Sequence, residues 1–186
     1  MNFANKITIF RILSVPFFIT SLVYYNPSRD YLRVIALAIF ILAVISDAID
    51  GYIARSRNQK TQAGAILDPL ADKILLITAF IFLYIISNQY FDTKLPLWVV
   101  LIVIFRDAIL LSGGGIIILA NQENKISPTW WGKISTFFQM ITIIFLLLKS
   151  HLSFYLWNTA IIFTVVSGVD YLRKGIVMFN TPLHRK

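Results

Sequence analysis

Six long apolar stretches, separated by short polar connections, constrain this chain more than any other feature of its sequence. A helix needs about 20 mostly apolar residues to cross the hydrocarbon core of a bilayer. In hydrocarbon every backbone polar group must find its partner within the protein, which favours helices. The sequence therefore predicts an all-α integral membrane protein with six transmembrane helices. The expected spans cover residues 12–25, 31–54, 69–91, 95–120, 129–148 and 152–178.

Composition agrees with a membrane protein and argues against an ordinary soluble domain. Hydrophobic residues make up 58% of the chain and charged residues 14%, whereas soluble domains have roughly 45–50% and about 25%. The absence of cysteine excludes a disulfide framework, a thiolate nucleophile and a zinc–thiolate site. The net charge of +8 is typical of cytoplasmic loops beside anionic headgroups. We therefore expect membrane lipids, and no nucleic acid, as partners.

The chain shows no linker or internal repeat, so residues 1–186 are expected to form a single membrane-embedded domain. Its first eleven residues, MNFANKITIFR, lack the apolar run and the small-residue cleavage site of a signal peptide. Phe3, Ile7 and Phe10 instead predict an N-terminal interfacial segment whose apolar side chains lie in the headgroup region.

The distribution of lysine and arginine predicts the orientation, because short cytoplasmic loops are enriched in these residues. With the N-terminus inside, the inside segments carry Lys6, Arg11, Arg55, Arg57, Lys60, Lys125, Lys133, Arg173, Lys174, Arg185 and Lys186. The outside segments carry Arg29, Arg33, Lys94 and Lys149. The excess predicts an N-in/C-in topology, with residues 47–72 near the cytoplasmic face of the cell membrane.

Four aspartates lie where the second span ends and the third begins. Asp47 and Asp50 are three residues apart, and Asp68 and Asp72 are four apart, so each pair shares one face of a helix. Four converging carboxylates cannot all stay ionised unless cations lie between them. Oxygen ligands without histidine or cysteine favour Mg²⁺, Mn²⁺ or Ca²⁺ over zinc. The spacing therefore predicts a site for hard divalent cations.

These carboxylates could instead serve one of two alternative roles. They could form structural ion pairs with Arg55, Lys73 and Arg106, although ionisable residues inside membranes usually mark function. They could also belong to a divalent-cation transporter. A transport path would distribute charged residues across the bilayer, whereas here they gather at one side of the membrane.

The segment DAIDGYIARSRNQKTQAGAILDPLAD resembles the signature DxxDGxxARx8Gx3Dx3D of the CDP-alcohol phosphatidyltransferases, with every gap matching. The fixed positions are Asp47, Asp50, Gly51, Ala54, Arg55, Gly64, Asp68 and Asp72. The N-terminal NKITIFRILSVP is also similar to the family's opening. The resemblance implies an enzyme of phospholipid biosynthesis that transfers the phosphatidyl group of CDP-diacylglycerol to an alcohol and releases CMP.

The same resemblance implies the roles of individual residues. It assigns two divalent cations, Mg²⁺ or Mn²⁺, to Asp47, Asp50, Asp68 and Asp72, and the role of general base to Asp72. A homodimer is usual for proteins of this kind. The expected donor-binding residues are Thr8, Gly51, Ala54, Arg55 and Gly64, and the expected acceptor-binding residues are Arg11, Arg106, Asp107 and Lys133.

The stretches around Arg106-Asp107 and Lys133 resemble the glycerol-type branch of the family. Its phosphatidylglycerophosphate synthases usually have Arg-Glu at the first position, a further arginine where this chain has Gly114, and a second lysine where it has Ser135. Glycerol 3-phosphate carries nearly two negative charges, so its pocket should supply several cations. The missing cations favour phosphatidylglycerol as acceptor, which implies a cardiolipin synthase; the alternative is glycerol 3-phosphate and a phosphatidylglycerophosphate synthase.

Overall fold

The residues that the structure describes form a bundle of six α-helices. The computed structural model describes the backbone of residues 3–57, 62–119 and 129–180, and the side chains of residues 9–49, 70–112 and 129–175. These ranges contain no β-strand, which confirms the predicted all-α class. The elements are α1 (Phe3–Val23), the 3₁₀ helix η1 (Pro27–Arg29), α2 (Tyr31–Arg57), α3 (Gln62–Tyr90), α4 (Leu97–Leu119), α5 (Trp130–Leu147) and α6 (Ser153–Asn180).

The surface of the bundle is apolar, as expected for helices that face lipid. Large apolar side chains are exposed on every helix; Phe17 on α1, Phe105 on α4 and Ile162 on α6 are each more than 60% exposed. Within the described residues, three segments are long and apolar enough to cross a membrane: Tyr31–Ile49, Leu70–Tyr90 and Trp130–Leu147. The presence of six spans and the N-in/C-in orientation stay predictions.

Several helices extend beyond the apolar runs that predicted them. The expected interfacial segment is continuous with the first span, because α1 begins at Phe3 and runs through Pro16 without a break. The third helix begins at Gln62 rather than at Pro69. Hydropathy marks the part of a helix that suits hydrocarbon, whereas backbone hydrogen bonds continue into the polar segment at its end.

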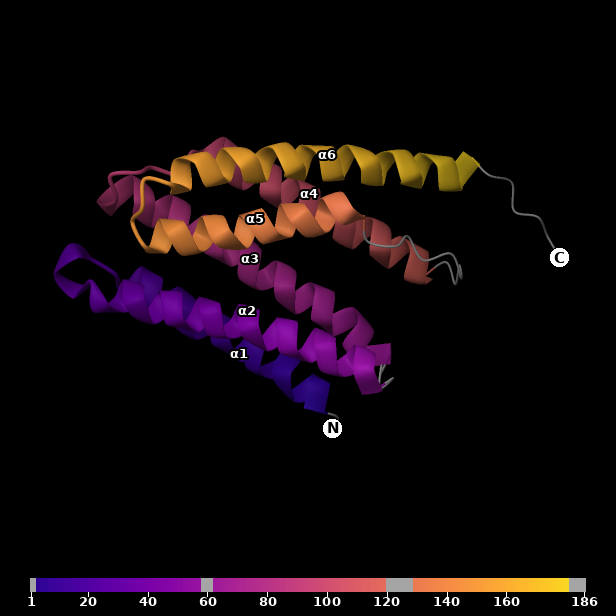
Figure 1. The fold of residues 1–186 in the computed structure, drawn as a ribbon, viewed down its shortest axis with the longest axis horizontal. Helices are drawn as coiled ribbons and strands as arrows, with labels where there is room; N and C mark the ends of the chain where they lie inside the picture. The colour runs from indigo at the N-terminus through magenta and orange to yellow at the C-terminus, as the bar shows by residue number, and fades with distance from the viewer. Residues whose placement is uncertain (1–2, 58–61, 120–128, 181–186) are drawn as a thin grey trace.

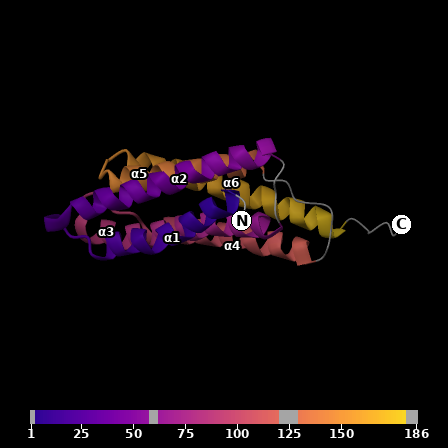
Figure 2. The same cartoon turned by 90° about the horizontal axis from the view of Figure 1, so that it is seen from below.

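Helix α3 lies between two groups of helices (Figure 1). On one side α1 packs against both α2 and α3, and on the other α6 packs against α4 and α5, while α3 contacts α4 and α5. Figure 2 shows the same helices from below. The end of α2 and the start of α3 therefore meet at one end of the bundle, together with the start of α1 (Figure 1).

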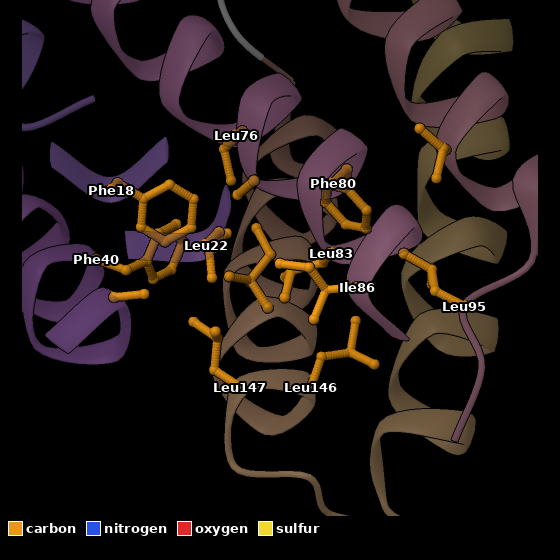
Figure 3. Packing of buried hydrophobic residues seen from close by; sticks show 14 of the residues in the cluster. Phe18, Leu22, Phe40, Leu76, Phe80, Leu83, Ile86, Leu95, Leu146 and Leu147 are labelled. Carbon is orange, nitrogen blue, oxygen red and sulfur yellow. The ribbon is translucent and has the colours of Figure 1, made fainter. Parts of the chain in front are cut away.

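An apolar core joins the two groups of helices (Figure 3). Phe18 of α1 and Phe40 of α2 are fully buried, with ring centroids 6.0 Å apart. Leu83 of α3 and Leu147 of α5 are also fully buried. Side chains in such a core interlock closely, which restricts relative movement of the helices. The core thus fixes α3 relative to α1 and α2, and with it the residues that α3 contributes to the site.

A charged cluster lies at the opposite end of the bundle from the α2–α3 junction. Asp30, after η1, accepts hydrogen bonds from Arg33 Nε at 2.9 Å and Lys149 Nζ at 2.9 Å. Arg33 also donates to the carbonyl oxygen of Leu147. The hydrogen bond from Arg33, followed by that from Lys149, holds the pKa of Asp30 well below its usual value. Asp30 in turn raises the pKa of Lys149.

Candidate active site

Two of the four motif aspartates can be placed with their side chains. Asp47 lies in the second half of α2 and Asp72 in the first half of α3. Both carboxylates are partly exposed, by 37% and 28%. The end of α2 and the start of α3 meet at one end of the bundle, which brings the two carboxylates near each other (Figure 1). Asp50 and Asp68 lie outside the described side chains, so the convergence of the two pairs stays a prediction.

Arg11 of α1 lies between these two carboxylates. Its Nη1 donates to Oδ1 of Asp72, and its Nη2 is 2.7 Å from Oδ1 of Asp47. The Arg11 side chain is 1% exposed. Arginine in an apolar environment is stable when its charge is paired. Here one guanidinium contacts a carboxylate from each of two helices. The structure thus places Arg11 beside the aspartates, although the sequence had suggested a role in acceptor binding.

The remaining motif positions lie in α1, α2 and α3, but their side chains fall outside the described residues. They are Thr8, Asp50, Gly51, Ala54, Arg55, Gly64 and Asp68. The helix bounds place the residues at 50, 51, 54 and 55 in α2 and those at 64 and 68 in α3. Their predicted roles in donor and metal binding stay predictions.

A second charged cluster lies directly beside the first. Lys73 Nζ is 2.8 Å from Oδ1 of Asp107, and Arg106 Nη1 is 2.7 Å from the same oxygen. Asp107 is fully buried and Arg106 is 5% exposed. Arg106 Nη2 also donates to Ser167 Oγ on α6 at 2.8 Å. Two cations share one carboxylate here, so the cluster carries a net positive charge.

The two clusters meet on α3, because Asp72 and Lys73 are consecutive residues. Asp72 contacts Arg11 of α1, and Lys73 contacts Asp107 of α4. An acidic site and a basic site therefore lie side by side. Adjacent clusters of opposite charge can attract a cation and an anion to neighbouring positions.

The start of α5 approaches Arg106 closely at Gly132. A Cβ atom added to Gly132 would lie 3.1 Å from Arg106 Nη2 and 3.3 Å from Ser167 Oγ. Thr129 caps the helix by accepting a hydrogen bond from the Gly132 backbone N–H at 3.2 Å. Lys133 Nζ lies 5.4 Å from the centre of the Trp130 ring. The backbone of α5, rather than the Lys133 side chain, is thus in contact with the Arg106 cluster.

Ser135 lies in a buried polar contact between α5 and α6. Its hydroxyl is 2.8 Å from Thr164 Oγ1, and Gln139 Nε2 donates to Thr164 Oγ1 at 3.0 Å. All three side chains have no exposed surface. Hydrogen bonds between helices strengthen their association where few other polar partners are present. Position 135 therefore serves helix packing in this chain.

The described carboxylates fit a hard divalent cation in their chemistry. Asp47 and Asp72 supply oxygen ligands from two helices that approach the same positive group, and such ligands suit Mg²⁺ and Mn²⁺. The described side chains contain no group of three potential metal ligands. Asp50 and Asp68, the other predicted ligands, lie outside that part of the chain.

The sequence suggested Lys73 as an ion-pair partner of the motif aspartates, but its pairing with Asp107 and the roles of Ser167 and Gly132 were not predicted. A signal was available for Lys73, because a lysine inside an apolar span next to Asp72 needs a carboxylate partner. A serine or a glycine in an apolar helix gives no comparable signal. Their contacts with Arg106 depend on how α5 and α6 pack against α4.

Comparison with known proteins identifies the family. Residues 1–166 match the family model described as CDP-alcohol phosphatidyltransferase. A Bacillus subtilis protein named CDP-diacylglycerol–glycerol-3-phosphate 3-phosphatidyltransferase is 36% identical to this chain, and the alignment covers 94% of this chain and 95% of the relative. A Haemophilus influenzae protein of the same name is 32% identical, covering 98% of both chains. A Mycobacterium tuberculosis protein named probable phosphatidylglycerophosphate synthase is 35% identical to this chain, and the alignment covers 94% of this chain and 82% of the relative. The chain therefore belongs to the CDP-alcohol phosphatidyltransferase family, and it is an enzyme of that class.

Proposed function

We propose that this enzyme transfers the phosphatidyl group of CDP-diacylglycerol to glycerol 3-phosphate, forming phosphatidylglycerophosphate and CMP. The observation that carries the proposal is the similarity, over nearly the whole chain, to relatives named for this acceptor. It replaces phosphatidylglycerol, the acceptor that the sequence favoured. That choice rested partly on the absence of a lysine at Ser135, whose side chain is buried against α6. The residue at that position therefore says little about the charge of an acceptor pocket.

Asp47, Asp50, Asp68 and Asp72 are the residues that would hold divalent cations, which members of this family generally use. Such cations neutralise the charge that develops when a phosphoanhydride breaks. Asp72 takes the proton from the acceptor hydroxyl, since it is partly exposed and lies beside the basic cluster. Arg55 holds a phosphate of the donor, while Gly51, Ala54 and Gly64 leave room for the nucleotide and Thr8 contacts it from α1.

The basic cluster on α3 and α4 supports an acceptor that carries a phosphate. Arg106 and Lys73 provide two cations for one carboxylate, which leaves positive charge for a second anion. Arg106 and Lys133 are the residues that we assign to the acceptor. Asp107 is fully buried. We therefore assign it the role of orienting Arg106 and Lys73, not of contacting the acceptor.

We place the enzyme in the cytoplasmic membrane as one domain with six spans, with both termini and the active site at the cytoplasmic side. Basic residues at 55, 57 and 60 follow Asp47 and Asp50 in sequence, which supports this orientation. A homodimer in the membrane is part of the same proposal.

An assay of the lipid product tests the choice of acceptor. Purified enzyme in detergent receives CDP-diacylglycerol and Mg²⁺ or Mn²⁺, with either glycerol 3-phosphate or phosphatidylglycerol. CMP is quantified, and the lipid is identified by mass spectrometry. We expect phosphatidylglycerophosphate with the first acceptor, and no product after treatment with EDTA. Cardiolipin from phosphatidylglycerol, without product from glycerol 3-phosphate, would contradict the proposal.

A further inference from the structure

Helix α1 supplies a buried cation to the aspartate site. Arg11 donates to Oδ1 of Asp72, and its Nη2 is 2.7 Å from Oδ1 of Asp47. Two carboxylates held this close to one point repel each other when no cation lies between them. In the arrangement described here, the guanidinium of Arg11 provides that cation. It therefore holds α2 and α3 together at the position where the motif aspartates meet.

Within the described part of the chain, the hydrogen bonds of Arg11 are incomplete. A guanidinium has five N–H donors, yet the Nε atom of Arg11 is buried with no hydrogen-bond partner in the described part of the chain. Its Nη2 is close to Asp47 but lacks the alignment of a hydrogen bond. Buried donors without partners lose the hydrogen bonds that they would make to water. Charge attraction, rather than a full set of hydrogen bonds, therefore holds Arg11 in this place.

A divalent cation at the same site would need the same oxygen atoms. Hard cations bind carboxylate oxygens directly, and the Oδ1 atoms of Asp47 and Asp72 are the ones that face Arg11. A guanidinium and a divalent cation at that distance from each other repel strongly in surroundings of low polarity. Occupancy of the site by one of them must therefore weaken binding of the other.

We propose that Arg11 is the internal counter-cation of the aspartate site and that a divalent cation displaces it on binding. The inference rests on the metal site of the proposed function. It makes Arg11 a positioning residue, which keeps Asp47 and Asp72 together before the metal arrives and lowers the affinity for the metal. Metal binding is then an exchange of one cation for another. Because Arg11 belongs to α1, the contact between α1 and the aspartates depends on whether the metal is bound.

The direction in which substitution of Arg11 changes the affinity for Mn²⁺ tests the proposal. Binding of Mn²⁺ to EDTA-stripped enzyme in detergent is followed by the electron paramagnetic resonance signal of free Mn²⁺. Arg11→Gln removes the competing charge, so we expect its Kd for Mn²⁺ to fall at least about tenfold below that of the wild type. Arg11→Lys keeps the charge but not the two-pronged geometry, so its Kd should lie between the two. A residue that merely supported the metal ligands would change the affinity in the opposite direction.

Thermal unfolding gives a second measurement on the same variants. In EDTA, Arg11→Gln should unfold at a lower temperature than the wild type, because Asp47 and Asp72 face each other without compensation. Mn²⁺ should then raise its unfolding temperature by more than it raises that of the wild type. Arg33→Gln is the matched control, since Arg33 pairs with Asp30 at the other end of the bundle. It should bind Mn²⁺ with the wild-type Kd.

Each outcome decides between the possibilities. If the wild type binds Mn²⁺ and the Arg11 variants bind it equally or more weakly, the counter-cation role is wrong and the proposed function stands. If the wild type does not bind Mn²⁺, the proposed metal site is wrong, and the proposed role of Arg11 is then wrong as well. If Arg11→Gln does not yield folded protein, Arg11→Lys decides, and a Kd equal to or above that of the wild type overturns the proposal.

Discussion

Lys73 and Asp107 form an ion pair between α3 and α4, with the ammonium nitrogen 2.8 Å from Oδ1 of a carboxylate that has no exposed surface. Arg106 contacts the same oxygen at 2.7 Å. The pair connects the helix that carries Asp72 to the helix that carries Arg106. It thereby fixes the acidic and basic clusters relative to each other.

Removal of the Asp107 charge should destabilise the protein strongly. Asp107→Asn leaves the buried Arg106 and the largely buried Lys73 as neighbouring cations without their shared carboxylate. We expect a loss of about 3–5 kcal/mol, the usual effect of breaking a buried ion pair on one side. Unfolding in detergent, followed by circular dichroism, measures it. Asp107→Glu keeps the charge and should retain most of the stability; equal losses in both variants would show that shape, not charge, matters at this position.

Asp72 should be essential for turnover but not for folding. Asp72→Asn removes the proposed base, and general-base catalysis contributes about 10²–10⁴-fold to rates. We expect a fall in kcat of that size, measured as CMP release, with a normal elution profile in gel filtration. Asp170→Asn is the control, because Asp170 pairs with Lys174 on the same helix and should leave kcat unchanged. Full activity of Asp72→Asn would remove the residue from the mechanism.

The close approach of Gly132 to Arg106 predicts a specific effect of one methyl group. The added Cβ would crowd Arg106 Nη2 at 3.1 Å, so Gly132→Ala should shift the guanidinium and weaken its bond to Ser167. We expect a loss of about 1–3 kcal/mol, typical of overpacking, and a higher KM for glycerol 3-phosphate. Gly175→Ala is the matched control, because nothing lies within 4 Å of its added Cβ. It should stabilise α6 by about 0.5–1 kcal/mol.

Lys149 adopts a left-handed backbone conformation, with φ of 54°. It follows α5, where its N–H donates to the Leu146 carbonyl and the Ser150 N–H donates to that of Phe145. Glycine is preferred at this position of a helix end. Lys149→Gly and Lys149→Ala both lose the ion pair with Asp30, so their comparison isolates the backbone. We expect the glycine variant to be about 1 kcal/mol more stable, as measured by thermal unfolding; equal stability would mean that the conformation carries no strain.

Acid should remove the stabilising effect of Asp30. Its pKa is held below the unfolded value of about 3.9, first by the hydrogen bond from Arg33 and then by that from Lys149. A carboxyl group with a lowered folded pKa stabilises the protein above its unfolded pKa and loses this effect as the pH falls through the folded pKa. The stability difference between wild type and Asp30→Asn should therefore be constant above about pH 5 and shrink below about pH 4. A difference that stays unchanged down to pH 3 would contradict the assignment.

The sequence was sufficient for the class of fold and for the family. Apolar runs of the length of a bilayer predict helices because hydrocarbon offers the backbone no other partners, and α2 begins at Tyr31, as the second run predicted. The spacing of the motif aspartates predicted that each pair shares a helix face; the structure shows Asp47 and Asp72 at the same arginine, and for Asp50 and Asp68 convergence stays a prediction. These features are local, or belong to neighbouring helices joined by a short connection.

Contacts between distant helices could be assigned only from the tertiary structure. Arg11 precedes Asp72 by 61 positions, and no local pattern states which carboxylate a buried arginine will meet. Ser135 looked like a missing cation of the acceptor pocket until the packing of α5 against α6 placed its hydroxyl beside Thr164. A sequence gives the period of each helix, whereas the rotation and height of one helix against another come from the packing of all their side chains together. That packing decides which charges pair in this enzyme.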